Sequence, residues 1–511
     1  MSTSSDNQLA GRLEDTAKQS GSIFALKIVV FVVGFFLNFV LARFFGSEVI
    51  GEYSLLLSVI NMALIFSVFG LDVAMIKFIP ISKSKNGIDG VNLVSFIALV
   101  SGVSLSIVMG IVLWLSSDFI ADKVFGAPQL HVLIKFGSIG IIPLTATRVL
   151  GGIYKGFRKS RTYVFIFELL SKIIILLLVT VVALLGYRES AYVAIAWVFC
   201  QLVIVSTLLV LSSKFGISLI RGYRSSNANA HIVSSERKTI FGFASTMILV
   251  AVMTFMLGKL DIIMIGIFMT PSDVGVYKVA LIISSLVLFV MSSSNSIFPS
   301  HISELYHNDK IHELRSMYSS ITKWIIVSTF PIVVSIIVFS VELLSIFGLE
   351  FISGAGALVI LTIGFCINTI VGSNGYMLNM SGHEKVVLAN NASMGIMNII
   401  LNVVLIPEYG IVGAAAATSV SVSVISIAKV IEVKILMDIF PYDNSYTPVV
   451  VGMLLLVTAS SIVHSYINSI IYIIPFSIVC VIVMVGLVYA YRDSRDELII
   501  QAVLGKLGRR V

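Results

Sequence analysis

Long apolar segments dominate this chain, and the turns between them repeat at a nearly constant distance along the sequence. Four landmarks in one order at nearly one offset indicate an internal duplication, and duplicated membrane halves are typical of transporters. Each landmark returns 222 to 226 residues later: Gly51-Glu52-Tyr53 as Gly275-Val276-Tyr277, Phe125-Gly126 as Phe347-Gly348, Gly156-Phe157-Arg158-Lys159 as Gly382-His383-Glu384-Lys385, and Gly186 as Gly410.

The composition excludes a soluble protein of this length. The 511 residues are 58% hydrophobic and 12% charged, whereas soluble chains are about 45–50% apolar and about 25% charged. The three cysteines lie inside apolar runs with no CxxC spacing, so neither a disulfide framework nor a metal site is expected. The net charge of +7 is explained by basic loops beside anionic lipid, without nucleic-acid binding.

The apolar segments predict an all-α integral membrane protein with about fourteen spans, since a span needs about 20 mostly apolar residues. The runs are too long for barrel strands, and they lack the alternation of apolar and polar residues that a barrel requires. The expected spans are 22–42, 54–76, 92–115, 131–151, 163–185, 191–212, 240–267, 276–298, 323–346, 355–377, 387–406, 411–433, 447–466 and 469–490.

Basic residues predict which ends of the spans face the cytoplasm. The termini and the loops on their side of the membrane hold 25 of the 34 lysines and arginines, and the opposite loops hold four. Under the positive-inside rule, both termini are therefore expected in the cytoplasm. No signal peptide is expected, because the first twenty residues are polar and the first span can direct insertion itself.

The longest cytoplasmic link divides the chain into two lobes of six helices each. An even number of helices in the first lobe starts both lobes on the same side, so the repeats are expected to be parallel, with the cleft between them. The predicted parts are a cytoplasmic N-terminal segment (1–21), an N-lobe (22–212), a linker (213–239), a C-lobe (240–433), two further helices (447–490) and a basic cytoplasmic tail (491–511).

The loops leave little room for an enzyme. No outside loop exceeds about sixteen residues, and no paired-carboxylate site, nucleotide-binding glycine loop or Ser/His/Asp set is recognisable. The chain is therefore interpreted as a carrier, not an enzyme, with no cofactor. It is expected to be driven by a gradient, with a proton or sodium ion as the candidate coupling ion.

Ionisable residues inside the spans are the candidate functional groups, since a mid-membrane charge costs at least about 2.5–3.5 kcal/mol. Arg148, Lys135 and Lys27 lie where they can alternatively snorkel to the membrane surface. Glu168 and Lys172 are four residues apart and can alternatively neutralise each other. The full set is Lys27, Lys135, Arg148, Glu168, Lys172, Lys259, Asp261 and Glu432.

Cations outnumber carboxylates among these residues, which favours an anionic cargo such as a phosphate or pyrophosphate head group. Lys259 and Asp261 are two residues apart, so they lie on different faces of one helix and are expected to face a cavity. Asparagines within the spans are either packing contacts or part of a wet, sugar-tolerant cavity. They are Asn38, Asn61, Asn295, Asn368, Asn391, Asn398 and Asn402.

Four strings resemble the Wzx-type polysaccharide biosynthesis flippases (O-antigen flippases) of the multidrug/oligosaccharidyl-lipid/polysaccharide (MOP) exporter superfamily. The resemblance implies a V-shaped, MATE-like pair of lobes in the bacterial inner membrane that moves undecaprenyl-pyrophosphate-linked glycan units to the periplasmic leaflet by alternating access. The strings run from Leu41 to Tyr53, from Phe69 to Pro80, from Leu260 to Gly266 with Val274 to Tyr277, and from Leu401 to Ala414.

The resemblance also suggests roles for the charged residues. In related flippases, basic residues of the first span and the central cavity contact the pyrophosphate. The candidate substrate-binding residues here are Lys27, Asn38, Arg148, Lys172 and Lys259, and the candidate coupling residues are Asp261 and Glu168. A polysaccharide polymerase or chain-length protein is the candidate partner. The alternatives are a MATE-like multidrug/cation antiporter and a membrane enzyme of the same sugar pathway.

Overall fold

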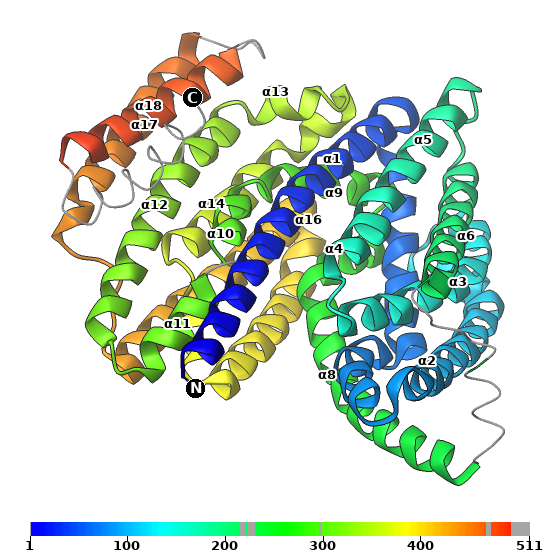
Figure 1. The fold of residues 1–511 in the computed structure, drawn as a ribbon. Helices are drawn as coiled ribbons and strands as arrows, with labels where there is room; N and C mark the ends of the chain where they lie inside the picture. Colours follow the sequence, from blue (N-terminus) through cyan, green and yellow to red (C-terminus); the bar gives the residue numbers. More distant parts are fainter. Residues whose placement is uncertain (1, 215–220, 222–229, 296–297, 467–471, 492–511) are drawn as a thin grey trace. The chain divides into compact units, whose positions relative to one another are not determined.

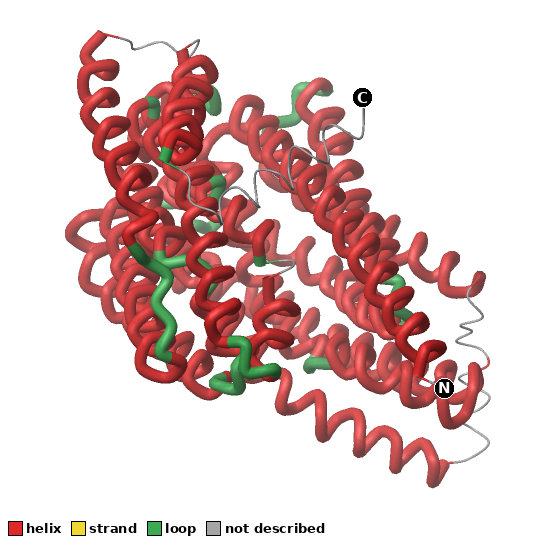
Figure 2. The backbone as a smooth tube through the Cα atoms, turned by 60° about the vertical axis from the view of Figure 1, so that its left-hand side comes forward, coloured by secondary structure: helices red, strands yellow, loops and turns green. Residues whose placement is uncertain are grey.

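The computed structural model describes residues 2–214, 221, 230–295, 298–466 and 472–491. Within these ranges the chain consists of helices joined by short loops, without a β-strand (Figure 2). This confirms the all-α fold that the apolar segments predict. Most of the predicted linker 213–239 and of the basic tail 491–511 lies outside the described residues.

The chain divides into two compact units, residues 1–275 and 276–511. The predicted lobes meet earlier, at the linker, and their bounds remain a prediction. The helices of the first unit are α1 (Ser2–Val68), α2 (Leu71–Phe119), η1 (Ile120–Val124), α3 (Leu130–Gly156), α4 (Ser160–Tyr163), η2 (Val164–Leu170), α5 (Ser171–Leu184), α6 (Ser190–Lys214) and α8 (Ala230–Phe268), and α9 (Pro271–Ser284) crosses the boundary.

The second unit continues with a series of helices of very different lengths. They are α10 (Val287–Ser294), α11 (Phe298–His307), α12 (Ile311–Val338), α13 (Ser340–Ser345), η3 (Leu349–Gly354), α14 (Ala355–Ile370), α15 (Asn374–Met380), α16 (Glu384–Met437), η4 (Asn444–Tyr446), α17 (Thr447–Tyr466) and α18 (Ile473–Ala490).

Eight helices in the described ranges are long and apolar enough to cross a membrane, or nine if the pair α9 and α10, bent by 49°, is one span. Several of these helices hold more than one expected span. The continuous stretch Ala25–Val124 includes three of the expected ranges, and α16 includes two. The chain is thus a multi-pass membrane protein, and the count of fourteen spans stays a prediction.

Glycines interrupt the longest helices where the sequence predicts loops. Gly46 in α1, Gly87 in α2 and Gly410 in α16 have non-helical backbone angles, with φ of 86°, 62° and 58°. These positive angles lie in the region that glycine adopts without steric cost. The helices therefore change direction at these points although their hydrogen-bonded turns are almost continuous.

The left-handed turns repeat along the chain at the same offset as the sequence landmarks. The matched pairs have positive φ in both halves, so the duplication extends to the backbone conformation of the turns. Gly87 pairs with Asp309 and Gly126 with Gly348, each 222 residues apart, and Arg158 pairs with Gly382 and Gly186 with Gly410, each 224 residues apart.

Close helix contacts in the first unit depend on residues without a side chain. α2 packs along α3, and α3 packs along α6 (Figure 1). A Cβ atom added to Gly152 of α3 would lie 2.1 Å from the carbonyl oxygen of Asp72 in α2. One added to Gly156 would lie 2.8 Å from the carbonyl oxygen of Met75. Small residues thus let α2 and α3 approach as closely as membrane helices do.

The repeated Gly-x-Tyr landmarks contact each other. A Cβ atom on Gly51 of α1 would lie 1.6 Å from the carbonyl oxygen of Pro271, and one on Gly275 of α9 would lie 1.9 Å from that of Ser47. The hydroxyls of Ser47 and Ser272 form a hydrogen bond of 2.7 Å. The two copies of the landmark therefore pack reciprocally, each glycine against the backbone of the other copy.

Candidate functional site

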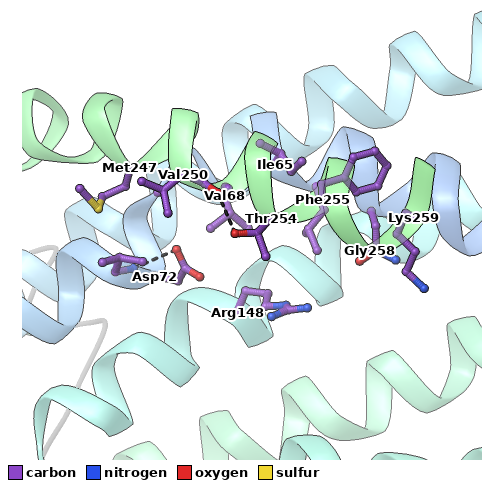
Figure 3. A pocket seen from close by; sticks show the side chains of 15 residues that line it. Ile65, Val68, Asp72, Arg148, Met247, Val250, Thr254, Phe255, Gly258 and Lys259 are labelled. Atoms are coloured by element: carbon purple, nitrogen blue, oxygen red, sulfur yellow. Dashed lines mark hydrogen bonds between the residues drawn. The ribbon is translucent and has the colours of Figure 1, made fainter. Parts of the chain in front are cut away.

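A cavity of about 420 Å³ lies within the first unit, between α1, α2, α3 and α8. Figure 3 shows side chains of α8 on one side of this cavity, with Asp72 and Arg148 on the other. Its lining is mostly apolar, with a few polar groups, as is usual for ligand sites. The polar side chains that line it are Asn61, Asp72, Arg148, Thr254 and Lys259.

The turn between α1 and α2 places Asp72 beside Arg148. Phe69 and Gly70 are both left-handed, with φ of 51° and 72°. This turn lies against α8, because a Cβ atom on Gly70 would be 2.4 Å from the carbonyl oxygen of Ala244. Gly152, which admits the backbone of Asp72, is one helical turn from Arg148 on the same face of α3. Both side chains therefore reach the same cavity.

Arg148 is held by aromatic rings and has no carboxylate partner within 4 Å among the described residues. Its guanidinium carbon lies 5.1 Å from the centre of the Phe167 ring. Phe167 stacks in turn on Tyr163, with ring centres 5.1 Å apart. The Arg148 Nε atom is buried and donates no hydrogen bond within the described chain. A planar cation fixed in this way is suited to an anionic ligand.

Further charges surround the inner end of this cavity. Lys155 lies two turns beyond Arg148 on α3, and its Nζ atom is 4.2 Å from the centre of the Tyr163 ring. Four other charged groups interact with the Lys155 ammonium. They are Asp72, Arg148, Glu168 and Lys27. Three cations and two carboxylates from α1, α2, α3 and η2 thus form one cluster with an excess of positive charge.

Lys259 is the second cation that lines the cavity. It is half-buried on α8, near the opposite end from Met247 (Figure 3). Asp261 is also half-buried and takes part in interactions of its own, but it does not line this cavity. The structure therefore separates these two neighbours, as their spacing of two residues on one helix predicts.

Lys172 and Asn38 do not line the cavity. The Lys172 Nζ atom donates to the carbonyl oxygen of Val30 in α1, at 3.2 Å. A Cβ atom on Gly34 would lie 2.6 Å from the same nitrogen, so glycine leaves the space that Lys172 occupies. The Asn38 Nδ2 atom donates to the Gly34 carbonyl oxygen of its own helix, at 2.7 Å. These two candidates contact the α1 backbone instead.

Two other sequence candidates lie near the cavity without lining it. Lys27 is exposed on α1 and interacts through its charge with Lys155. Glu168 lies on the π-helical turn η2, and its charge acts on both Lys155 and Lys172. π-Helical turns are frequent at functional sites. Lys135, one of the residues expected to snorkel, forms an ion pair of 3.2 Å with Asp118.

The sequence analysis missed Asp72, Lys155 and Lys429. Asp72 falls within the expected span 54–76, and counting every carboxylate inside a span would have found it. Lys155 was assigned to a loop, whereas α3 continues to Gly156. Lys429 falls within the expected span 411–433, and its Nζ atom donates to Asn391 Oδ1 at 3.2 Å.

In the second unit, the asparagines form contacts between helical segments. Asn390 donates to Glu432 Oε2 at 2.6 Å. Asn398 donates to the Thr418 hydroxyl at 3.3 Å, and the Ser426 hydroxyl donates to Asn368 Oδ1 at 2.7 Å. These contacts fit the packing interpretation of the asparagines in this unit.

Comparison of the sequence with known proteins identifies relatives that carry glycans or lipids. The chain matches two proteins of Haloferax volcanii, the "Probable low-salt glycan biosynthesis flippase Agl15", at 31% identity over 194 residues, and the "Probable flippase AglR", at 31% over 176 residues. The first match covers 37% of this chain and 40% of the relative, and the second covers 34% and 37%. The matched stretch therefore spans well under half of either relative.

Solved structures show how widely this fold is shared. The lipid II flippase MurJ in an inward closed conformation superposes with a TM-score of 0.71 at 14% identity, over 92% of this chain and 99% of MurJ. An inward-facing multidrug resistance MATE family transporter of the MOP superfamily gives a TM-score of 0.62 at 16% identity, over 82% of this chain and 98% of that chain. At these identities the likeness concerns the fold alone.

The family match covers more than half of the chain. The family described as "Polysaccharide biosynthesis protein" matches residues 40–351, a range that includes all four helices around the cavity. The chain therefore belongs to the polysaccharide biosynthesis protein family, with a fold shared with the MurJ and MATE transporters.

Proposed function

We propose that this protein is a flippase that moves a lipid-linked oligosaccharide across the membrane by alternating access. The lipid tail stays in the bilayer, while the charged, sugar-bearing head passes through the interior of the protein. Membership of the family and the two flippase relatives support this proposal. The carrier's task is transport and not bond chemistry, which agrees with relatives named as flippases.

The observation that carries the proposal is the environment of Arg148. Its guanidinium lies in the cavity wall over Phe167, with a buried Nε atom that has no acceptor within the described residues. A pyrophosphate entering a membrane protein must exchange its water for such donors, because an uncompensated charge is costly there. Arg148 would supply a fork of donors and Lys259 a point charge, and we assign Lys27 to the path that leads to them.

The finer features of the cargo and the route follow from the sequence. We propose an undecaprenyl-pyrophosphate carrier lipid, movement from the cytoplasmic to the periplasmic leaflet of a bacterial inner membrane, and both termini in the cytoplasm. The glycan would serve a surface polysaccharide such as O-antigen, capsule or exopolysaccharide. A polymerase or chain-length protein would then receive the product.

A gradient would reset the carrier after each cycle. Asp261 and Glu168 are our candidate coupling residues, for a proton or a sodium ion. Both are half-buried carboxylates on helices of the first unit, and Glu168 belongs to the charge cluster around Lys155. A cycle that links ion binding to head-group release would need such groups close to the cavity.

A multidrug/cation antiporter is the second candidate function. The MATE likeness supports it at the level of the fold. A carrier of cations would present carboxylates to its cargo, whereas Arg148 and Lys259 outnumber Asp72 among the lining residues. Drug susceptibility of a pump-deleted host that expresses this protein separates the two, because only the antiporter would raise resistance to cationic drugs.

Deletion of the protein in its host tests the flippase directly. Lipid-linked glycan units are extracted, and their sidedness is read with a non-permeant lectin or glycosidase. The proposal predicts that these units accumulate on the cytoplasmic side and that surface polymer is lost. Unchanged glycan lipids and unchanged surface polymer would contradict it.

A further inference from the structure

A second pocket, of about 410 Å³, lies between the α2 helix near Pro80 and the turn after α3. It lies at the end of the helices that the basic loops assign to the cytoplasm. Two cations and a hydroxyl line it, and its lining residues include no carboxylate. The lining residues are Ile79, Pro80, Lys83, Ser84, Gly156, Phe157 and Arg158.

Arg158 adopts a backbone conformation that favours glycine. Its φ is 59°, in the left-handed region, where a Cβ atom is disfavoured. The matching turn of the second half, 224 residues later, has Gly382 in this region, with φ of 85°. Residues held in disfavoured conformations concentrate at functional sites. The first half thus keeps an arginine where its own duplicate uses glycine, which points to a task for the side chain.

The other cation of this pocket is held against an aromatic ring. The Lys83 Nζ atom lies 5.4 Å from the centre of the Phe157 ring. The turn in the second half lacks these features, because Gly382 is followed there by His383, whose ring nitrogen forms a hydrogen bond with the Ser381 hydroxyl at 2.9 Å, and by Glu384. The basic pocket is therefore particular to the first half.

Cations along α3 connect this pocket with the cavity. Arg148 lines the cavity, Lys155 follows two turns later on the same face, and Arg158 lies in the turn that ends the helix. Seven residues of α-helix correspond to about 10 Å. Lys155 interacts with the charges of Arg148 and Asp72 in the cavity wall. An anionic head group would thus meet a cation at each step between the two sites.

We propose that this pocket is a loading site that binds the phosphate head of the lipid-linked substrate before it enters the cavity. This inference rests on the flippase function proposed above. The chemistry recognised is a phosphate or pyrophosphate ester at the membrane surface. Two lipids can supply it, the glycan carrier with its pyrophosphate and a bulk phospholipid with its phosphodiester, and the proposal assigns the pocket to the first.

A cysteine in the pocket provides a direct binding assay. The native Cys200, Cys366 and Cys480 are all buried, whereas Ser84 is exposed. The full-length Ser84→Cys variant is placed in phosphatidylcholine nanodiscs and labelled with an impermeant maleimide. Inorganic pyrophosphate is titrated at constant ionic strength. We expect pyrophosphate to slow the labelling of this cysteine in a saturable manner.

The Arg158→Gly variant tests the role of the side chain without straining the fold, because glycine suits the left-handed turn. In the Ser84→Cys background, this change should weaken the apparent affinity for pyrophosphate about tenfold, as for one lost charge-assisted contact. Lys85→Gln is the matched control, since Lys85 is an exposed cation of the same segment that does not line the pocket. It should leave the affinity within about twofold.

Three results would overturn the proposal. They are unchanged protection in Arg158→Gly, an equal loss in Lys85→Gln, and equally strong protection by phosphatidylglycerol placed in the nanodisc, which would make the pocket a bulk-lipid site. The assay involves neither glycan nor transport. Its failure therefore leaves the deletion experiment for the flippase unaffected, and failure of the deletion experiment leaves this binding result readable.

Discussion

Arg148 and Lys172 are both cations inside expected membrane spans, yet their contacts differ. Arg148 lines a cavity and stacks on Phe167. Lys172 donates to the Val30 carbonyl oxygen in the space left by Gly34. A backbone acceptor satisfies part of the need of a buried ammonium. At this scale, the contacts of a charge, more than its depth in the membrane, separate a candidate ligand-binding group from a packing group.

Replacement of Arg148 by Met should reduce transport about tenfold or more, as expected for a lost charge-assisted contact. Arg148→Lys should recover part of the rate, because it restores the charge without the planar fork. The readout is surface polymer in a deletion strain with equal amounts of protein in the membrane. Lys135→Met is the control, because Lys135 pairs with Asp118 outside the cavity. Equal losses in both Met variants would contradict the assignment.

Lys259→Ala and Lys27→Ala should also stop export at normal membrane levels, by the removal of a cation from the cavity or from the path to it. The same polymer assay measures this effect. Wild-type export by either variant would remove that lysine from the proposed mechanism.

Gly34 and Lys172 should behave as one unit in stability measurements. Gly34→Ala would place a methyl group 2.6 Å from the Lys172 Nζ atom, so it should destabilise the protein. The same change in a Lys172→Ala background should cost about 1 kcal/mol less, because residues in contact are not additive. Thermal unfolding of the four purified variants gives this coupling. Additive effects would show that the two side chains act separately.

At the scale of helices, glycine determines where two elements meet. α1 and α9 approach through Gly51 and Gly275, each against the backbone of the other copy of the landmark. α2 and α3 approach through Gly152. The sequence identifies the first pair by its repetition. It cannot reveal that the pair is in contact, because an offset of 224 residues carries no information on distance in space.

Gly51→Ala should destabilise the protein strongly. The added Cβ atom would lie 1.6 Å from the Pro271 carbonyl oxygen, which is backbone and cannot rotate away. Overpacking of this kind costs about 1–3 kcal/mol, and sometimes more. Gly242→Ala is the matched control, because no atom lies within 4 Å of its added Cβ. Membrane yield and thermal unfolding give the measurement, and equal behaviour of the two variants would contradict the contact.

At the scale of the whole molecule, hydropathy predicts much of the fold. The expected spans fall on helices, because apolar length alone decides which segments can cross a bilayer. Hydropathy gives no sign that helices continue through Gly46, Gly87 and Gly410. It also places Asp72 within an apolar span and Lys155 within a loop, so two charges of the cavity region were missed.

The candidate site was predicted in part. Arg148 and Lys259 were singled out as charges inside spans, and both line one cavity. Lys172 and Asn38 were singled out for the same reason but contact α1. The face of each helix that meets the cavity depends on tertiary packing. One sequence can show which residues are charged but not which of them share a cavity.

The predicted topology can be tested with reporter fusions. The excess of basic residues predicts that a fusion after Arg161 reports a cytoplasmic position and a fusion after Arg188 an external one. Alkaline phosphatase is active only outside the cytoplasm, and green fluorescent protein fluoresces only inside. The reverse pattern at these two sites would contradict the orientation and, with it, the cytoplasmic position of the loading site.

Transport by the purified protein in proteoliposomes tests the central claim most directly. The movement of a polyprenyl-pyrophosphate-linked sugar is measured with a non-permeant glycosidase, beside the uptake of a cationic dye under the same gradient. The account predicts rapid movement of the pyrophosphate-linked sugar in the wild type, a strong reduction in Arg148→Met, and no uptake of the dye. Dye uptake without movement of the sugar would contradict it.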